Sequence, residues 1–75
     1  MITTFEDRKP TLEEAQGIVG GFVEMVLLPK DINVQVLVNE EGLLEDLPVN
    51  QEASELCGQK IVGPVIVLKG DAKWT

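Results

Sequence analysis

The sequence predicts a small α+β fold, in which two helices pack against a mainly antiparallel sheet of three or four strands. Two short amphipathic segments, residues 12–19 and 51–57, are each flanked by residues that start and stop helices. Runs rich in Val, Ile and Leu at residues 22–28, 34–38 and 61–69 are typical of strands. The order is helix, strand, strand, helix, strand, with room for a strand ahead of it. This order favours helices that cover one face of the sheet.

The first helix is predicted by a capping box at its start. The Thr11 hydroxyl can accept a bond from the backbone amide of Glu14, and the Glu14 carboxylate can reach back to Thr11. Gly20-Gly21 ends the helix, because one glycine can take the left-handed cap conformation. The residues at helical spacing that we expect to face the core are Leu12, Ala15, Ile18 and Val19.

The central strands are predicted from the apolar runs. Residues 22–28 and 34–38 lie on either side of a short turn that contains Pro29, which favours an antiparallel hairpin. In the last run Pro64 donates no backbone hydrogen bond, so we expect regular pairing to begin at Val65.

A turn and a second helix follow the hairpin. Residues 39–42, Asn-Glu-Glu-Gly, form a turn in which Gly42 is free to take a positive φ. Asn50 is the expected cap of a helix over residues 51–57, and Gly58 marks its end. The residues of this helix that we expect to face inward are Ala53, Leu56 and Cys57.

The two ends of the chain carry weaker signals. Residues 1–10 form a polar lead-in, in which Ile2 and Phe5 permit a short edge strand. Residues 70–75 form a polar tail apart from Trp74. The tryptophan either packs on the edge of the sheet or serves as a contact residue.

The strands carry more apolar residues than burial on one face requires. In residues 22–28 the apolar side chains fall on both faces, and the same holds for residues 65–68. If both helices cover one face, the other face leaves an apolar patch of the kind that marks protein interfaces. We therefore expect a homo-oligomer that forms through a sheet face. The alternative is that the helices and the connection over residues 43–49 wrap both faces.

Length and charge restrict the classes of function. The chain has 75 residues, 13 acidic and 6 basic, with a formal net charge of −7, and we expect one domain over residues 1–75. An acidic chain without a basic run repels phosphate, which argues against nucleic acids and anionic membranes as partners. The sequence shows no secretory signal, and no apolar run reaches the roughly 20 residues that span a bilayer. The expected location is the cytoplasm.

The missing residue types exclude several kinds of chemistry. The sequence has no His, and Cys57 is its one cysteine. One chain therefore cannot build a Cys/His zinc site, a Ser-His or Cys-His nucleophile pair, or an internal disulfide. Neither a P-loop nor a dinucleotide-binding glycine motif occurs. We expect no cofactor, and Cys57 is interpreted as a core residue rather than a nucleophile.

Six residues are candidates for binding a ligand or a partner: Gly20, Gly21, Glu24, Asn39, Glu40 and Gly42. Glu24 interrupts seven otherwise apolar positions, so it faces a ligand or a subunit interface, or lies on the solvent side of a half-buried strand. The Gly20-Gly21 amides either approach an anion or serve only as a cap before a change of direction. The acidic residues after the hairpin lack the alternating spacing of a calcium loop, so no metal site is expected.

Four sequence elements occur in a recognisable order within residues 12–68. They are a Val-Gly-Gly-aromatic-aliphatic-Glu element at residues 19–24, an Asn-Glu-Glu-Gly turn at 39–42, a Leu-Pro-x-Asn-x-x-Ala element at 47–53 and an Ile-x-Gly-x-aliphatic strand at 61–65. Together they resemble a family of small phage-encoded and mobile-element proteins of unknown function. The resemblance implies a viral or mobile-element origin, expression in a bacterial cytoplasm and no established enzymatic activity.

Three hypotheses for the function follow. The first is a non-enzymatic interaction module that binds a host or phage protein and also has the apolar surface to self-associate. The second is a protein that binds a small, nucleotide-like ligand, with the Gly20-Gly21 amides and Lys30 or Lys60 as anion contacts. The third is an enzyme that uses Glu24 as a general base in a site without water. No catalytic motif supports the third hypothesis.

Overall fold

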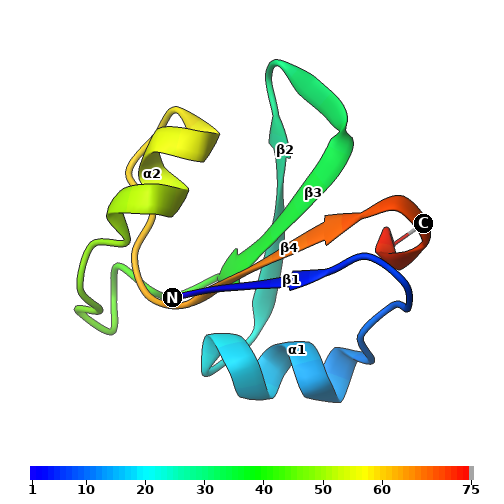
Figure 1. The fold of residues 1–75 in the computed structure, drawn as a ribbon. Helices are drawn as coiled ribbons and strands as arrows, with labels where there is room; N and C mark the ends of the chain where they lie inside the picture. The colour runs from blue at the N-terminus through cyan, green and yellow to red at the C-terminus, as the bar shows by residue number, and fades with distance from the viewer. Residues whose placement is uncertain (75) are drawn as a thin grey trace.

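The computed structural model describes residues 1–74 and confirms the predicted α+β fold (Figure 1). The elements in chain order are β1 (Ile2–Phe5), α1 (Leu12–Val19), β2 (Val23–Leu28), β3 (Asp31–Asn39), α2 (Gln51–Cys57), β4 (Val65–Lys69) and a short 3-10 turn, η1 (Gly70–Ala72). The predicted helix bounds and the predicted start of the last strand at Val65 are confirmed.

The four strands form one mixed sheet in the order β1-β4-β3-β2. The pairs β2–β3 and β3–β4 are antiparallel, as predicted, whereas β1 runs parallel to β4. The lead-in therefore contains the strand that Ile2 and Phe5 permit, and Ile2 pairs with Val65. This order makes β1 and β2 the two edge strands.

Both helices begin and end as their capping residues predict. The Thr11 hydroxyl accepts a bond from the Glu14 amide, and the Glu14 carboxylate accepts one from the Thr11 amide, each at 3.0 Å. Asn50 caps α2 by accepting a bond from the Ala53 amide at 3.1 Å. Each helix ends on a glycine in the left-handed conformation, Gly20 in α1 and Gly58 in α2.

The helices lie on opposite faces of the sheet (Figure 1), so the expectation that both cover one face is wrong. The reason lies in β3, where Leu37 points to one face and Val36 and Val38 to the other, and all three are buried. Beneath α1, on the α1 face, the core contains Ala15, Val19, Leu37, Ile66, Leu68 and Ala72. Beneath α2, on the α2 face, it contains Leu28, Val34, Val36, Val38, Ala53, Cys57, Ile61, Val65 and Val67.

Two residues expected to face the core are exposed. Leu12, in the first turn of α1, is 55% exposed and lies outside the core of the α1 face. Just before this turn, the Pro10 carbonyl accepts a bond from the Trp74 indole Nε1 at 3.1 Å. Leu56 is exposed because it lies at the side of α2 that borders an open groove.

The hairpin differs from its prediction at both ends. β2 begins at Val23, and Phe22 lies just outside it with 65% of its surface exposed. β3 begins at Asp31 because the turn is tight and Leu28 pairs directly with Asp31. The register then shifts between Leu27 and Leu28, which is the signature of a β-bulge.

The C-terminal segment is packed rather than only polar. Ala72 is buried in the α1-face core, and Trp74 packs against the same cluster. The Gln35 side chain donates to the Trp74 carbonyl at 2.7 Å and accepts from the Trp74 amide at 2.6 Å. Of the two roles predicted for Trp74, packing and contact with a partner, the structure shows packing.

Candidate functional site

A groove of about 370 Å³ lies on the α2 face, where β2 begins and β3 ends. We call it the acidic groove. Four of the six candidate residues, Glu24, Asn39, Glu40 and Gly42, line it, whereas Gly20 and Gly21 do not. Val26, Val38 and Ile61 give the groove apolar walls, and Lys60 is its single basic residue.

The acidic residues of the groove carry uncompensated charge. Glu24 pairs with Val38 across the strands, and the Phe22 carbonyl accepts a bond from the Glu40 amide. Glu24 and Glu40 are therefore diagonal neighbours on one face, with a spacing of about 7–8 Å by ordinary sheet geometry. The one ion pair within residues 1–74 joins Arg8 to Glu14, so Lys60 does not neutralise either carboxylate by direct contact.

Asn39 has a structural role. It is 6% exposed, and its Nδ2 donates to the Val19 carbonyl at 3.2 Å and to the Glu45 carboxylate at 3.0 Å. Its Oδ1 accepts a bond from the Glu41 amide at 2.8 Å. The side chain thus joins the end of α1 to the turn after β3, and its hydrogen bonds are used within the chain.

The candidate glycines are explained by backbone shape and close packing. Gly20 has a φ of 84°, and the Gly20 and Gly21 amides both donate to the Gln16 carbonyl, at 2.9 and 3.1 Å. A Cβ added to Gly21 would lie 3.0 Å from the Asn39 Nδ2. Because both amides already have an acceptor, they do not form the anion contact that the ligand hypothesis requires.

Gly42 is required for a different reason from the predicted one. It does not have a positive φ; in this turn the residue with that conformation is Asp46, with a φ of 56°. A Cβ on Gly42 would instead lie 2.7 Å from Cγ2 of Val62. The glycine therefore lets the turn approach the segment before β4.

The open edge of β2 is a feature that the sequence did not reveal. Phe22 and Glu40 form a hydrogen-bonded pair, and bonded and non-bonded pairs alternate along an antiparallel ladder. Glu24 and Val26 therefore also bond to β3. The backbone N–H and C=O groups of Val23, Met25 and Leu27 consequently point away from the sheet.

Apolar side chains accompany these free backbone groups. Met25 is 39% exposed and Leu27 64% exposed, both on the α1 face but outside its core. No side-chain or loop hydrogen bond within residues 1–74 uses the backbone of Val23, Met25 or Leu27. Alternation within residues 23–27 shows which side chains share a face, but only the strand order shows that this strand lies at an edge.

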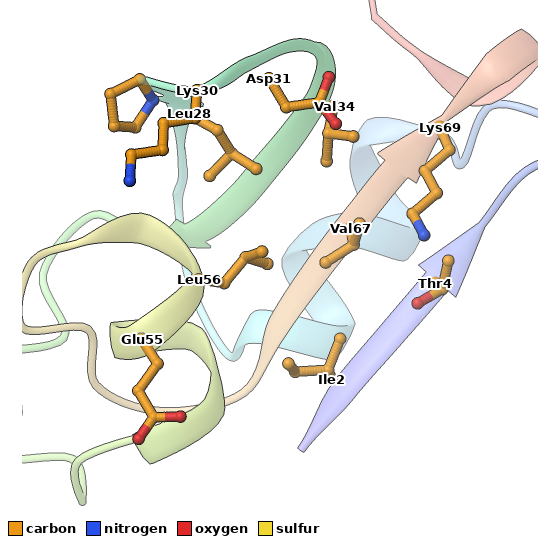
Figure 2. Close-up of a pocket in the computed structure, with 11 residues that line it drawn as sticks. Ile2, Thr4, Leu28, Lys30, Asp31, Val34, Glu55, Leu56, Val67 and Lys69 are labelled. Carbon is orange, nitrogen blue, oxygen red and sulfur yellow. The ribbon is translucent and has the colours of Figure 1, made fainter.

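A second groove, of about 490 Å³, lies beside α2 (Figure 2). Figure 2 shows Ile2, Val67 and Leu56 converging on its apolar floor from β1, β4 and α2. Two lysines, Lys30 and Lys69, and two acids, Asp31 and Glu55, also line it. The two positive and two negative charges balance, so the charge of this groove favours no class of ligand.

The remaining features of residues 1–74 concern metals, membranes and the thiol. Within the described chain no three acidic, His or Cys side chains gather as a metal site would require, and no helix of residues 1–74 has the length and apolarity to cross a membrane. Cys57 is buried, and its burial raises the pKa of the thiol. A thiol that stays protonated is a poor nucleophile, in agreement with its place in the core.

Comparison with known proteins gives one match. The model of a family described as a domain of unknown function, DUF3846, matches residues 2–75. Comparisons with curated proteins and with solved structures give no match. The description of the family assigns no activity.

Proposed function

The chain belongs to the DUF3846 family, and we propose that it is a non-enzymatic protein-interaction module whose binding surface is the β2 edge. The observation that carries this proposal is the row of free backbone groups at Val23, Met25 and Leu27. An exposed strand with unpaired N–H and C=O groups is a template for a further strand. Proteins commonly bind extended segments by adding them to such an edge.

The side chains of the edge favour the same interaction. Met25 and Leu27 offer apolar contacts on the α1 face, and Phe22, just before the strand, is exposed as well. An added strand would place alternate side chains against these residues. Backbone hydrogen bonds would then supply affinity, and the apolar side chains would supply preference for a partner.

The two alternative functions have less support. The ligand hypothesis needs the Gly20-Gly21 amides, which already bond to Gln16, with Lys30 or Lys60 beside them. Each of these lysines lines a groove that Gly20 and Gly21 do not line. The general-base hypothesis needs a carboxylate shielded from water, and the Glu24 side chain is exposed.

The resemblance to small phage-encoded proteins supports an accessory role. In that setting the module acts in a bacterial cytoplasm, and its partner is a host or phage protein. The acidic composition, with a net charge of −7, keeps such a protein soluble when it is not bound.

The experiment selects peptides from a random display library for binding to the wild-type protein. The binding of the selected peptides to the Met25→Pro variant is then measured. The Met25 N–H points away from β3, so proline there removes a free donor and no bond of the sheet. Selected peptides should bind the wild type and Leu44→Ser, whose side chain is exposed elsewhere. They should lose most binding to Met25→Pro at an unchanged circular dichroism spectrum. Equal binding to Met25→Pro would overturn the proposal.

A further inference from the structure

We infer that the strand added to β2 is β2 of a second copy of the chain, in an antiparallel register with Met25 opposite Met25. This inference rests on the proposed function, because it names the partner of the same edge. The two sheets would join into one sheet of eight strands, four from each copy. A twofold axis would pass between the two Met25 residues, as in other isologous dimers.

The free backbone groups select this register. Met25 lies at the centre of the three outward-facing residues, so a twofold axis there pairs Val23 with Leu27 of the second copy and Met25 with itself. Each of these three pairs exchanges two backbone bonds. One neighbouring register places Val23 opposite Pro29, which has no N–H to donate, and the other places Glu24 opposite Glu24.

The side chains fit the same register. On the α1 face, Val23 meets Leu27 and Met25 meets Met25, so the exposed apolar surface of the edge is covered by its own counterpart. On the α2 face, Glu24 lies opposite Val26. Glu24 is the one charged residue of β2, so no carboxylate directly faces another across the joint.

The other surfaces of the molecule fit a second copy less well. Both sheet faces already carry a helix, so face-to-face packing would have to displace α1 or α2. The β1 edge has only four residues, and Thr3 and Thr4 on it are polar and exposed. The β2 edge is longer and more apolar, which favours it over β1 for pairing.

Charge gives this dimer a recognisable salt dependence. The two Glu24 side chains would be diagonal neighbours, about 7–8 Å apart, and each copy carries a net charge of −7. Salt screens such repulsion between exposed groups. The affinity of the dimer should therefore rise as salt is added, whereas the affinity for a basic strand from another protein would fall.

The first test is analytical ultracentrifugation of the wild type, Met25→Pro and Leu44→Ser over a wide range of concentrations. Wild type and Leu44→Ser should form dimers to the same extent, and Met25→Pro should remain monomeric with an unchanged circular dichroism spectrum. Leu27→Lys, which leaves the backbone intact, should weaken the dimer at least tenfold. A monomeric wild type at every concentration, or equal dimerisation of Met25→Pro, would overturn the inference.

The register is tested by disulfide cross-linking. In the inferred register Glu24 and Val26 form a non-bonded pair with Cα atoms about 4.5 Å apart, within disulfide range. The double variant Glu24→Cys/Val26→Cys should cross-link into covalent dimers, and neither Glu24→Cys nor Val26→Cys alone should. Efficient cross-linking by either single variant would show a neighbouring register and overturn this one.

The third test measures how the dimer dissociation constant changes with salt and with the charge of Glu24. The dimer should tighten between about 50 and about 500 mM salt, and Glu24→Gln should tighten it about two- to fivefold. Weakening by salt contradicts the inference. If the wild type is monomeric but binds selected peptides through Met25, the dimer is contradicted and the proposed function is supported. If Met25→Pro binds the peptides as well as the wild type does, both the proposed function and the dimer are contradicted.

Discussion

Asn39 joins the end of α1 to the turn that directly follows its own strand, β3. Its amide nitrogen holds the end of α1 through the Val19 carbonyl, and the same side chain bonds to Glu41 and Glu45 in the turn after β3. Removal of a buried amide side chain leaves its partners without hydrogen bonds, and each such unpaired group lowers the free energy of unfolding. The residue therefore stabilises the wall of the acidic groove.

Replacing Asn39 by Ala should destabilise the protein by about 2–3 kcal/mol, since the Val19 carbonyl and the Glu41 amide lose their buried partner. Urea denaturation measures the change. Asn33→Ala is the matched control, because the Asn33 side chain is exposed and makes no bond within residues 1–74. Equal stability of the two variants would contradict the role of Asn39.

Two glycines at one helix should respond oppositely to the same substitution. Gly17 lies inside α1 with nothing within 4 Å of an added Cβ, so Gly17→Ala should stabilise by about 0.5–1 kcal/mol. Gly20 has a φ of 84°, so Gly20→Ala should destabilise by about 1 kcal/mol. Thermal denaturation of both variants checks the signs, and a shift in the same direction would refute this explanation.

At the scale of elements, the start of α1 is held by charge as well as by its cap. Arg8 donates two bonds to the Glu14 carboxylate, each at 2.8 Å. The bonds from Arg8 and from the Thr11 backbone lower the pKa of Glu14 from 4.5 to about 2. Both side chains are exposed, so the pair contributes modestly to stability.

This pKa shift predicts how the free energy of unfolding depends on pH. Because the folded pKa is lower than the unfolded one, the contribution of Glu14 is complete above pH 4.5 and is lost as the pH falls toward 2. Glu14→Gln should be less stable than the wild type at pH 6, with the difference shrinking in acid. Urea midpoints across this range measure it, and a constant difference would argue against the pair.

The elements differ in how well the sequence predicts them. The helices were predicted closely because Thr11 and Asn50 act within a few residues of their own position. The face of the sheet that each helix covers was not predicted, since no local sequence signal shows to which face a helix returns. Leu12 fits the apolar spacing of α1 yet is exposed, because periodicity shows which residues share a helix face and not how much of that face is covered.

The candidate site was predicted in part. Glu24, Asn39, Glu40 and Gly42 do gather at one groove, because the hairpin pairs the start of β2 with the end of β3. Asn39 and Gly42, however, have packing roles there. The free edge at Met25 was missed, since an edge is defined by the strand order and not by the residues of the strand.

At the scale of the whole molecule, the two ends of the chain are joined through Trp74. Its indole donates to the carbonyl of Pro10, and its backbone bonds twice to Gln35 in the middle of the sheet. The C-terminal segment thus closes the α1-face core at the start of α1. Contacts between such distant residues contribute to stability only once the fold is complete.

Trp74→Ala should destabilise the protein by about 2 kcal/mol, less than the loss of a fully buried tryptophan, because the side chain is half-buried. Trp74→Phe keeps the apolar contact and should cost about 1 kcal/mol for the lost bond to Pro10. Chemical denaturation followed by circular dichroism measures both. No loss for Trp74→Phe would indicate that the indole N–H bond contributes nothing, and equal losses for the two variants would indicate that the apolar contact contributes nothing.

The parallel pairing of β1 with β4 also bears on how the protein is made. Residues 2–5 leave the ribosome before residues 65–68, which are their partners in the sheet. The sheet is therefore completed only after residues 65–68 have been made, and β1 has no partner until then. Chains truncated before residue 65 should remain unfolded and be degraded.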